Sequence, residues 1–331
     1  MKAWCYFLLA TIIVSCSPLK KITFSPHTPF NEKEISNQLR IEFNGVATFY
    51  IQHKGSAVLT DPFITNPGFR KVTFGKIYSD TILLNRYAPK THNIKLVSMG
   101  HAHYDHILDL PYFLPKLSKE TKIVGSKNTV AIAKTLQPIQ EVIDIAALKA
   151  NPTKLGTWVY ATDSTVRIMA IQSAHLPHIG HKHLYHGHYE TAPGIFPQQV
   201  KEFLQDETLA YLIDFLYASF QPEKRIYFSS SAVSYPNGFF PAEILKEKSV
   251  DVAILSVALS QKAANYPTAL VQFLQPEKTI ICHWENFFRN REKKLKAVSL
   301  TNHQQFQKAL DSLKTITEIH FIKPGNSWVV E

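Results

Sequence analysis

The feature that most constrains this chain is a cluster of metal-binding residue types at the end of a predicted strand. Residues 95–99 are mostly apolar and favour a short strand that ends at Gly100, and His101-Ala102-His103-Tyr104-Asp105-His106 follows directly. Imidazole and carboxylate groups suit Zn(II), Fe(II) or Mn(II), and four such side chains cannot all converge from one face of a helix. We therefore expect a metal site on a loop at this strand end.

The remaining pattern predicts strands and helices that alternate along the chain. Bends at Asn44-Gly45 and Lys54-Gly55 predict hairpins over residues 41–60. We expect further strands at 122–124, 158–160, 166–171, 208–215, 225–229, 252–255, 279–282, 318–322 and 327–330. Helices are expected near 79–85, 108–117, 126–136 (with Ser126 as its cap), 241–246, 267–274 and 302–313. The last two strands flank a predicted turn at 324–326, and the whole order indicates two layers of sheet with helices outside.

The cluster has the form H-x-H-x-D-H, and in this the chain resembles the metallo-β-lactamase superfamily. Three further segments support the resemblance: residues 49–63, which end near Asp61, then Ala174-His175, and finally Cys282-His283-Trp284. The similarity runs from about residue 46 to residue 330. It implies an α/β fold, a four-layered αββα sandwich. Within the superfamily the chain looks closest to the branch of ascorbate-phosphate lactonases and N-acyl-phosphatidylethanolamine-hydrolysing phospholipases.

The resemblance also implies which side chains hold metal. It assigns one ion to His101, His103 and His175 and a second to Asp105, His106 and His283. The expected cofactor is zinc, as one or two ions, with iron or manganese as alternatives. Asp105 is the candidate catalytic residue, because its carboxylate can orient the attacking water. Asp61 is expected to orient a metal-bound histidine from behind.

One expected ligand is missing. The family's bridging aspartate should follow the strand at 225–229, but the chain has Ser231 at that position. A serine hydroxyl is a poor ligand for these metals unless it is ionised. The sequence therefore leaves open whether one ion or two are held.

A histidine-rich loop follows the strand at 166–171. It carries six imidazoles, at positions 175, 178, 181, 183, 186 and 188. His175 is favoured as the third ligand, with His178 as a further candidate, because His175 comes directly after Ala174. For the other histidines three roles are open. They could buffer zinc, contact an anionic substrate, or belong to a polar loop without a further role.

The N-terminus resembles a bacterial lipoprotein signal. Lys2 is followed by an apolar stretch too short for a comfortable membrane span, and Ile13-Val14-Ser15-Cys16 resembles a lipobox. We expect a signal peptide at 1–15, a lipidated Cys16 with a tether at 16–40, and one metallo-β-lactamase-like domain at 41–331. The protein would then be anchored in the bacterial cell envelope, facing the periplasm. Cys282 would be its only free thiol and is expected to be buried.

The charge and composition of the chain limit the partners that can be expected. The chain of 331 residues has a formal net charge of +10, which favours anionic neighbours. Because no basic stripe with interleaved aromatic residues is present, nucleic acid is not an expected partner. The leading hypothesis is a hydrolase whose metal-activated water attacks an ester, lactone or phosphodiester in a small or lipid-like anionic substrate. The alternative is a catalytically impaired metal- or ligand-binding lipoprotein of the same fold, which Ser231 motivates. The sequence does not indicate an oligomeric state.

Overall fold

The computed structural model describes residues 22–28, 37–216 and 220–330. Its first seven-stranded sheet has the order β14-β1-β2-β3-β4-β5-β6. The strands β14, β1, β2 and β3 pair antiparallel, which confirms the predicted hairpins, and β3 to β6 pair in parallel. These strands are β1 (Leu39–Gly45), β2 (Thr48–His53), β3 (Ser56–Thr60), β4 (Ile94–Ser98), β5 (Lys122–Gly125), β6 (Glu141–Asp144) and β14 (Asn326–Val330).

The second sheet, also seven-stranded, has the order β13-β12-β11-β10-β9-β8-β7. Here β7 to β10 pair antiparallel and β10 to β13 pair in parallel. These strands are β7 (Val159–Tyr160), β8 (Val166–Gln172), β9 (Leu209–Leu216), β10 (Pro222–Ser229), β11 (Val252–Ser256), β12 (Lys278–Cys282) and β13 (Glu318–His320). Strands β9 and β11 are buried along their whole length, as expected for strands covered on both faces.

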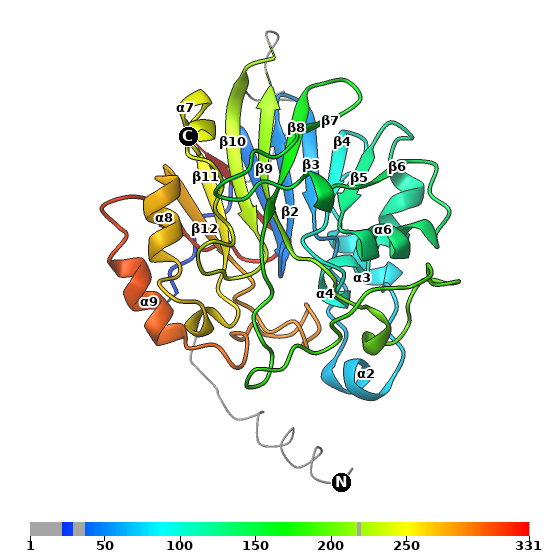
Figure 1. Ribbon diagram of the computed structural model, residues 1–331. Coiled ribbons are helices and arrows are strands. Elements are labelled where there is room, and N and C mark those ends of the chain that lie inside the picture. Colours follow the sequence, from blue (N-terminus) through cyan, green and yellow to red (C-terminus); the bar gives the residue numbers. More distant parts are fainter. Residues whose placement is uncertain (1–21, 29–36, 217–219, 331) are drawn as a thin grey trace.

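Helices lie outside the two sheets. Figure 1 shows α8 and α9 on one side of the sheets and α3 and α6 on the other, which makes the four-layered αββα sandwich that the sequence predicted. The helices are α2 (Phe69–Phe74), α3 (Thr81–Tyr87), α4 (Tyr104–Ile107), α5 (Leu110–Phe113), α6 (Lys127–Lys134), α7 (Glu243–Glu247), α8 (Thr268–Leu274) and α9 (His303–Asp311). Single 3₁₀ turns are η3 (Leu114–Lys116), η4 (Ala146–Leu148), η5 (Val200–Glu202) and η6 (Ser260–Lys262). Among the described residues, none of the helices combines the length and the apolar character that a membrane span requires.

Several predicted elements differ in detail. The helix expected at 108–117 is divided into α5 and η3, because Pro111 and Pro115 each occupy the first turn of a separate short element. Ser126 precedes α6 but does not cap it; its hydroxyl bonds Thr129 and Asp206, and Asp206 accepts the hydrogen bond from the Asn128 N–H instead. Strand β6 and helix α2 were not predicted at all.

The last two predicted strands do not pair with each other. Both strands and the turn between them exist, and the Asn326 N–H donates to the Lys323 carbonyl. However, β13 is the edge of the second sheet and β14 is the edge of the first. The turn therefore carries the chain from one sheet to the other instead of closing a hairpin.

The predicted signal peptide and Cys16 lie outside the described residues. Residues 22–28, within the expected tether, lie against the body of the protein: the N–H groups of Ser25 and Thr28 donate to the carbonyls of Phe321 and Ser327. The Phe24 ring packs 5.2 Å from the Trp284 ring. Cys282 is buried, as expected.

Candidate metal centre

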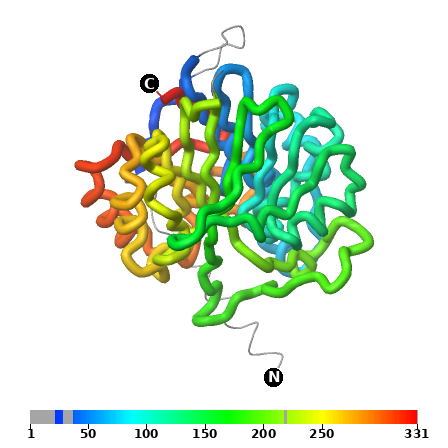
Figure 2. Tube along the Cα trace, turned by 45° about the horizontal axis from the view of Figure 1, so that its top comes forward, coloured from blue at the N-terminus to red at the C-terminus, as the bar shows by residue number. Residues whose placement is uncertain are grey.

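The candidate ligands come from three strand ends that lie at one end of the sandwich. His101 and His103 follow β4, His175 follows β8 and His283 follows β12. Strands β8, β10 and β12 run in the same direction, so their carboxyl ends open on one edge of the second sheet. Figure 2 shows the segment after β8 crossing this end of both halves of the molecule. The topology of the two sheets therefore brings these residues to the same end of the sandwich.

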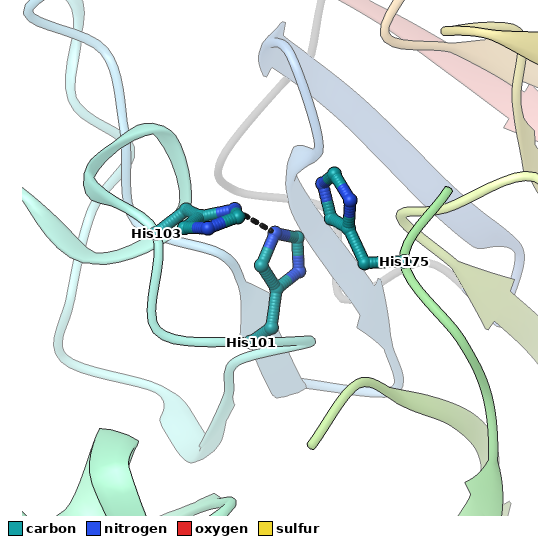
Figure 3. A group of neighbouring side chains, drawn as sticks. All are labelled: His101, His103 and His175. Carbon is teal, nitrogen blue, oxygen red and sulfur yellow. Dashed lines mark hydrogen bonds between the residues drawn. The ribbon is translucent and has the colours of Figure 1, made fainter. Parts of the chain in front are cut away.

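The first group consists of three histidines. Ring nitrogens of His101, His103 and His175 lie within 4.8 Å of one another, and Figure 3 shows the three rings facing a common point. His101 Nε2 lies 3.1 Å from His103 Nδ1. His175 donates from Nδ1 to the Leu176 carbonyl at 2.7 Å, which leaves its Nε2 free to act as a ligand.

The second group combines one carboxylate with two histidines. Asp105 and His106 lie in the single turn α4 rather than on a loop, and His283 comes from the other sheet. Asp105 Oδ2 is 3.6 Å from His106 Nε2 and 3.5 Å from His283 Nε2. The rings of His101 and His106 are 4.0 Å apart, so the two groups adjoin.

Asp61 supports the second group through a contact with His106. Its Oδ2 lies 2.7 Å from His106 Nδ1, and its Oδ1 accepts a hydrogen bond of 2.6 Å from the Gly100 N–H. Gly100 leaves room for the Ser230 side chain, because a Cβ at position 100 would lie 2.2 Å from the Ser230 hydroxyl oxygen, which would have to move. Asp61 and His283 both adopt left-handed backbone conformations, with φ of 37° and 57°. Such strained residues often occur at functional sites.

Burial keeps the first three imidazoles in the form that binds metal. It lowers the pKa of His103 to about 3, against the opposing effect of Asp105. Burial likewise holds the pKa values of His101 and His175 well below their usual range, with neighbouring imidazoles adding to the effect. All three side chains are therefore neutral near pH 7, with a lone pair available.

In the second group, in contrast, neighbouring charges favour the charged forms of the side chains. Burial disfavours the charged form of His106, but Asp105 and Asp61 outweigh it and raise the pKa of His106. Burial alone would raise the pKa of Asp105, yet His106 and His283 hold it well below its usual range. This group thus carries the one ionised carboxylate among the six donors.

Three separations between donors are close to those around a bound divalent metal. Two ligands at 2.0–2.1 Å from one tetrahedral ion lie about 3.3 Å apart. One pair in the first group is 3.1 Å apart and two pairs in the second are 3.5 and 3.6 Å apart, while all donor atoms of a group lie within 4.8 Å of one another. Three neutral imidazoles suit zinc, and two histidines with a carboxylate suit zinc, iron or manganese.

Ser231 lies two residues beyond the end of β10 and is buried. Its carbonyl accepts a hydrogen bond of 2.8 Å from the Ser229 hydroxyl. It does not line the cavity described below. The chain therefore places a small neutral side chain at the position that the resemblance assigns to a bridging carboxylate.

The six histidines of the histidine-rich loop differ in their roles. His175 belongs to the first group, whereas His178 belongs to neither. The His178 ring stacks on His175 at 4.5 Å, and its Nδ1 accepts a hydrogen bond of 3.1 Å from the Leu184 N–H. The other four histidines are exposed; they are His181, His183, His186 and His188.

The analysis of the sequence missed the residue that fixes this loop. The Asn128 side chain donates to the carbonyls of Gly187 and Leu204, at 2.9 and 2.7 Å, and accepts from the Tyr189 N–H at 3.1 Å. Asn128 is buried at the start of α6. No motif marks it, because its partners lie about sixty to seventy-six residues further along the chain.

A large cavity opens over both groups. Its volume is about 1470 Å³, and His103, Asp105, His175 and His283 line it. Among the aromatic residues near the ligand motifs, Tyr104, Tyr185, Phe287 and Phe288 line it too, whereas Tyr189, Phe239, Phe240 and Trp284 do not. Asn286 lines the cavity, whereas Glu285 points inward and accepts a hydrogen bond from the Val46 N–H. Most of the remaining wall comes from residues 65–82 and 286–301.

Comparison with known proteins agrees with this architecture. Residues 40–194 match the family model described as "Beta-lactamase superfamily domain". No curated protein matches the chain. Residues 40–194 are therefore similar to this superfamily, and the two sheets with helices outside agree with the αββα sandwich of the metallo-β-lactamase fold.

Solved structures share the fold at low sequence identity. A metallo hydrolase from the archaeon Ignicoccus hospitalis KIN4/I is 16% identical, with a TM-score of 0.53 over 89% of this chain and 99% of the other. A possible metal-dependent hydrolase from Veillonella parvula DSM 2008 is 13% identical, with a TM-score of 0.51 over 89% and 100%. An isothiocyanate hydrolase from Delia radicum gut bacteria is 12% identical, with a TM-score of 0.50 over 87% and 98%. At these identities the similarity concerns the fold.

Proposed function

We propose that this chain hydrolyses an ester, lactone or phosphodiester bond with the help of zinc, one ion in each of the two donor groups. The observation that carries the proposal is the convergence of six metal-binding donors in two adjoining groups, and four of these donors line one cavity. When bound, a divalent ion supplies a water that is nucleophilic at neutral pH and stabilises negative charge that develops on the substrate. The donor set suits zinc, with iron or manganese as alternatives in the second group.

Asp105 is the candidate catalytic residue. Its carboxylate is ionised, lines the cavity and lies between His106 and His283. From this place it can accept a hydrogen bond from the attacking water and orient it toward the substrate. His178 lines the same cavity, and because its Nδ1 accepts a hydrogen bond, the neutral ring presents an Nε2–H donor.

The cavity favours an anionic substrate with an apolar part. Seven arginine and lysine residues line it, against two carboxylates, Asp80 and Asp105. Asp80 is occupied in capping α3, and Asp105 belongs to the second metal group. The aromatic wall and a volume of about 1470 Å³ leave room for more than a small headgroup. A phosphorylated or lipid-like molecule meets these conditions.

The proposed location is the bacterial cell envelope, with the protein anchored through lipidated Cys16 and facing the periplasm. The support is the lipobox-like sequence from Ile13 to Cys16. Metabolic labelling with a fatty acid, compared with Cys16→Ala, tests this part: label in the parent protein alone supports it, and label in neither contradicts it.

Ser231 favours a second candidate function, a metal- or ligand-binding lipoprotein without turnover. The two candidates are separated by assaying zinc-loaded protein against phosphodiester, lactone and β-lactam substrates. Asp105→Asn is the test variant, and Asp163→Asn, which changes a half-exposed carboxylate paired with Lys95, is the matched control. Turnover that Asp105→Asn abolishes and Asp163→Asn retains supports the hydrolase. No turnover of any substrate in zinc-replete protein favours the binding protein.

A further inference from the structure

The rim of the metal-site cavity concentrates exposed apolar side chains. Thirteen large hydrophobic side chains are exposed in the described part of the chain, and six of them line this one cavity. The six are Phe69, Tyr78, Ile82, Ile179, Tyr185 and Leu300. Contiguous exposed apolar surface of this kind is uncommon on a soluble domain and marks a site of contact with a partner or a membrane.

Helix α2 is the most exposed part of this rim. None of its six residues is buried, and the Phe74 side chain at its end is 73% exposed. The helix is held at its base, where the Phe69 N–H donates to the Phe288 carbonyl at 3.2 Å and the two rings meet edge to face at 5.8 Å. Figure 1 shows α2 standing out from the end of the sandwich that carries the site. Its apolar side chains are therefore supported but not covered by other described residues.

Cations without acidic partners lie among these apolar side chains. Arg70, Lys71 and Lys76 come from the α2 region. Arg289, Lys293, Lys294 and Lys296 come from the opposite wall. Within the described ranges, none of the seven forms an ion pair with a carboxylate. Lysine and arginine mixed with phenylalanine, tyrosine and isoleucine are the composition of surfaces that insert shallowly into anionic bilayers.

From these observations we propose that the cavity rim, formed by α2, the start of α3 and residues 289–300, docks on an anionic phospholipid bilayer. The apolar side chains enter the headgroup region while the cations contact lipid phosphates, so the cavity mouth faces the membrane surface. The described segment 22–28 also lies near this end, because Phe24 packs on Trp284, the residue after ligand His283. An anchor at Cys16 would lie at most about 20 Å of extended chain from Ile22.

Tryptophan fluorescence in vesicles tests the docking with the full chain. Phe74→Trp places the probe on α2, and Phe220→Trp is the matched control, since Phe220 is 63% exposed and lies in the β9–β10 connection, at the opposite end of β10 from Ser231. Each variant is incorporated into vesicles that contain brominated lipid with phosphatidylglycerol, and the wild-type signal is subtracted. We expect strong quenching of Phe74→Trp and little of Phe220→Trp. The quenching should decrease at least twofold in 0.5 M NaCl, in purely zwitterionic vesicles, and when Lys71→Glu and Lys76→Glu are added.

Equal quenching at the two positions, or none at Phe74→Trp, overturns the proposal. A blue shift of Phe74→Trp that depends on protein concentration and occurs without vesicles assigns this face to a second copy of the chain instead. The experiment requires neither metal nor turnover, and His103→Ala should dock as the wild type does. Failure of docking is thereby distinguished from failure of the proposed hydrolysis.

Discussion

Asp61 joins the loop that begins at Gly100 to the second metal group through His106. One carboxylate oxygen accepts from the Gly100 N–H at 2.6 Å, and the other lies 2.7 Å from His106 Nδ1. Asp61 is fully buried at the end of β3, so both contacts are shielded from water. The pairing directs His106 Nε2 toward Asp105 and determines which nitrogen is free to bind metal.

Replacing Asp61 should weaken metal binding in the second group. In Asp61→Asn the charge beside His106 is lost, and we expect the affinity for the second ion to decrease by about 10–100-fold, as is usual for partners of metal-bound histidines. Chelator competition followed by metal analysis measures this. Asp163→Asn, remote from the site, should leave both ions unchanged. Equal metal affinity in Asp61→Asn and wild type would contradict the role assigned to Asp61.

Two histidines of the loop should respond differently to removal. His175→Ala should lose one bound ion, because His175 is one of three donors in its group. His178→Ala should keep both ions, since its Nδ1 is engaged by the Leu184 N–H and the ring lies outside both groups. The metal content per chain of the two variants tests this assignment. Loss of an ion from His178→Ala with retention in His175→Ala would exchange the two assignments.

Restoring a carboxylate at position 231 should tighten the second site. The six donors bring only one carboxylate, so two divalent ions there repel each other with little compensation. We expect Ser231→Asp to increase the affinity for the second ion by at least tenfold, and Ser231→Asn, of equal size without the charge, to leave it close to the wild-type value. Titration with zinc in the presence of a fluorescent chelator measures both. A gain in the Asn variant as large as in the Asp variant would rule out the electrostatic explanation.

A buried ion network stabilises the second sheet far from the site. Arg225 is fully buried and bonds Asp214 at 2.7 Å, Glu247 at 2.8 Å and the carbonyls of Ile244 and Lys248. Arg225→Met removes this donor from all four acceptors, although Arg167 still contacts Asp214 and Glu247.

We therefore expect a decrease of about 3 kcal/mol in the free energy of unfolding for Arg225→Met, the low end for a broken buried pair. Urea denaturation measures it. Lys314→Ala, which removes the exposed pair with Asp311, should leave the free energy of unfolding close to the wild-type value. Similar values for the two variants would contradict the importance of burial.

The ligands were predictable because each follows an apolar strand. Strands β4, β8 and β12 are marked by mostly hydrophobic residues, and His101, His175 and His283 follow their ends. The H-x-H-x-D-H spacing then made the metal site specific. What the sequence pattern could not indicate was that Asp105 and His106 lie in a helical turn, because four residues are too few to show a helical period.

Long-range partners account for the parts that were not predicted. The cap of α6 comes from Asp206, eighty residues beyond Ser126. The sheet to which β14 belongs is decided by its pairing with β1, at the opposite end of the chain. Helix α2 has no buried face, so no apolar period marks it, and β6 is half-exposed at a sheet edge. Local patterns do not contain these contacts.

The central claim is that both donor groups hold metal, and metal content per chain tests it most directly. The full chain is purified without a histidine tag, equilibrated with zinc, passed through a desalting column and analysed by mass spectrometry for metals, beside His103→Ala and His283→Ala. The account predicts two equivalents in the wild type and one in each variant, with thermal unfolding confirming that the variants are folded. No tightly bound metal in the wild type, or the same content in all three proteins, would contradict it.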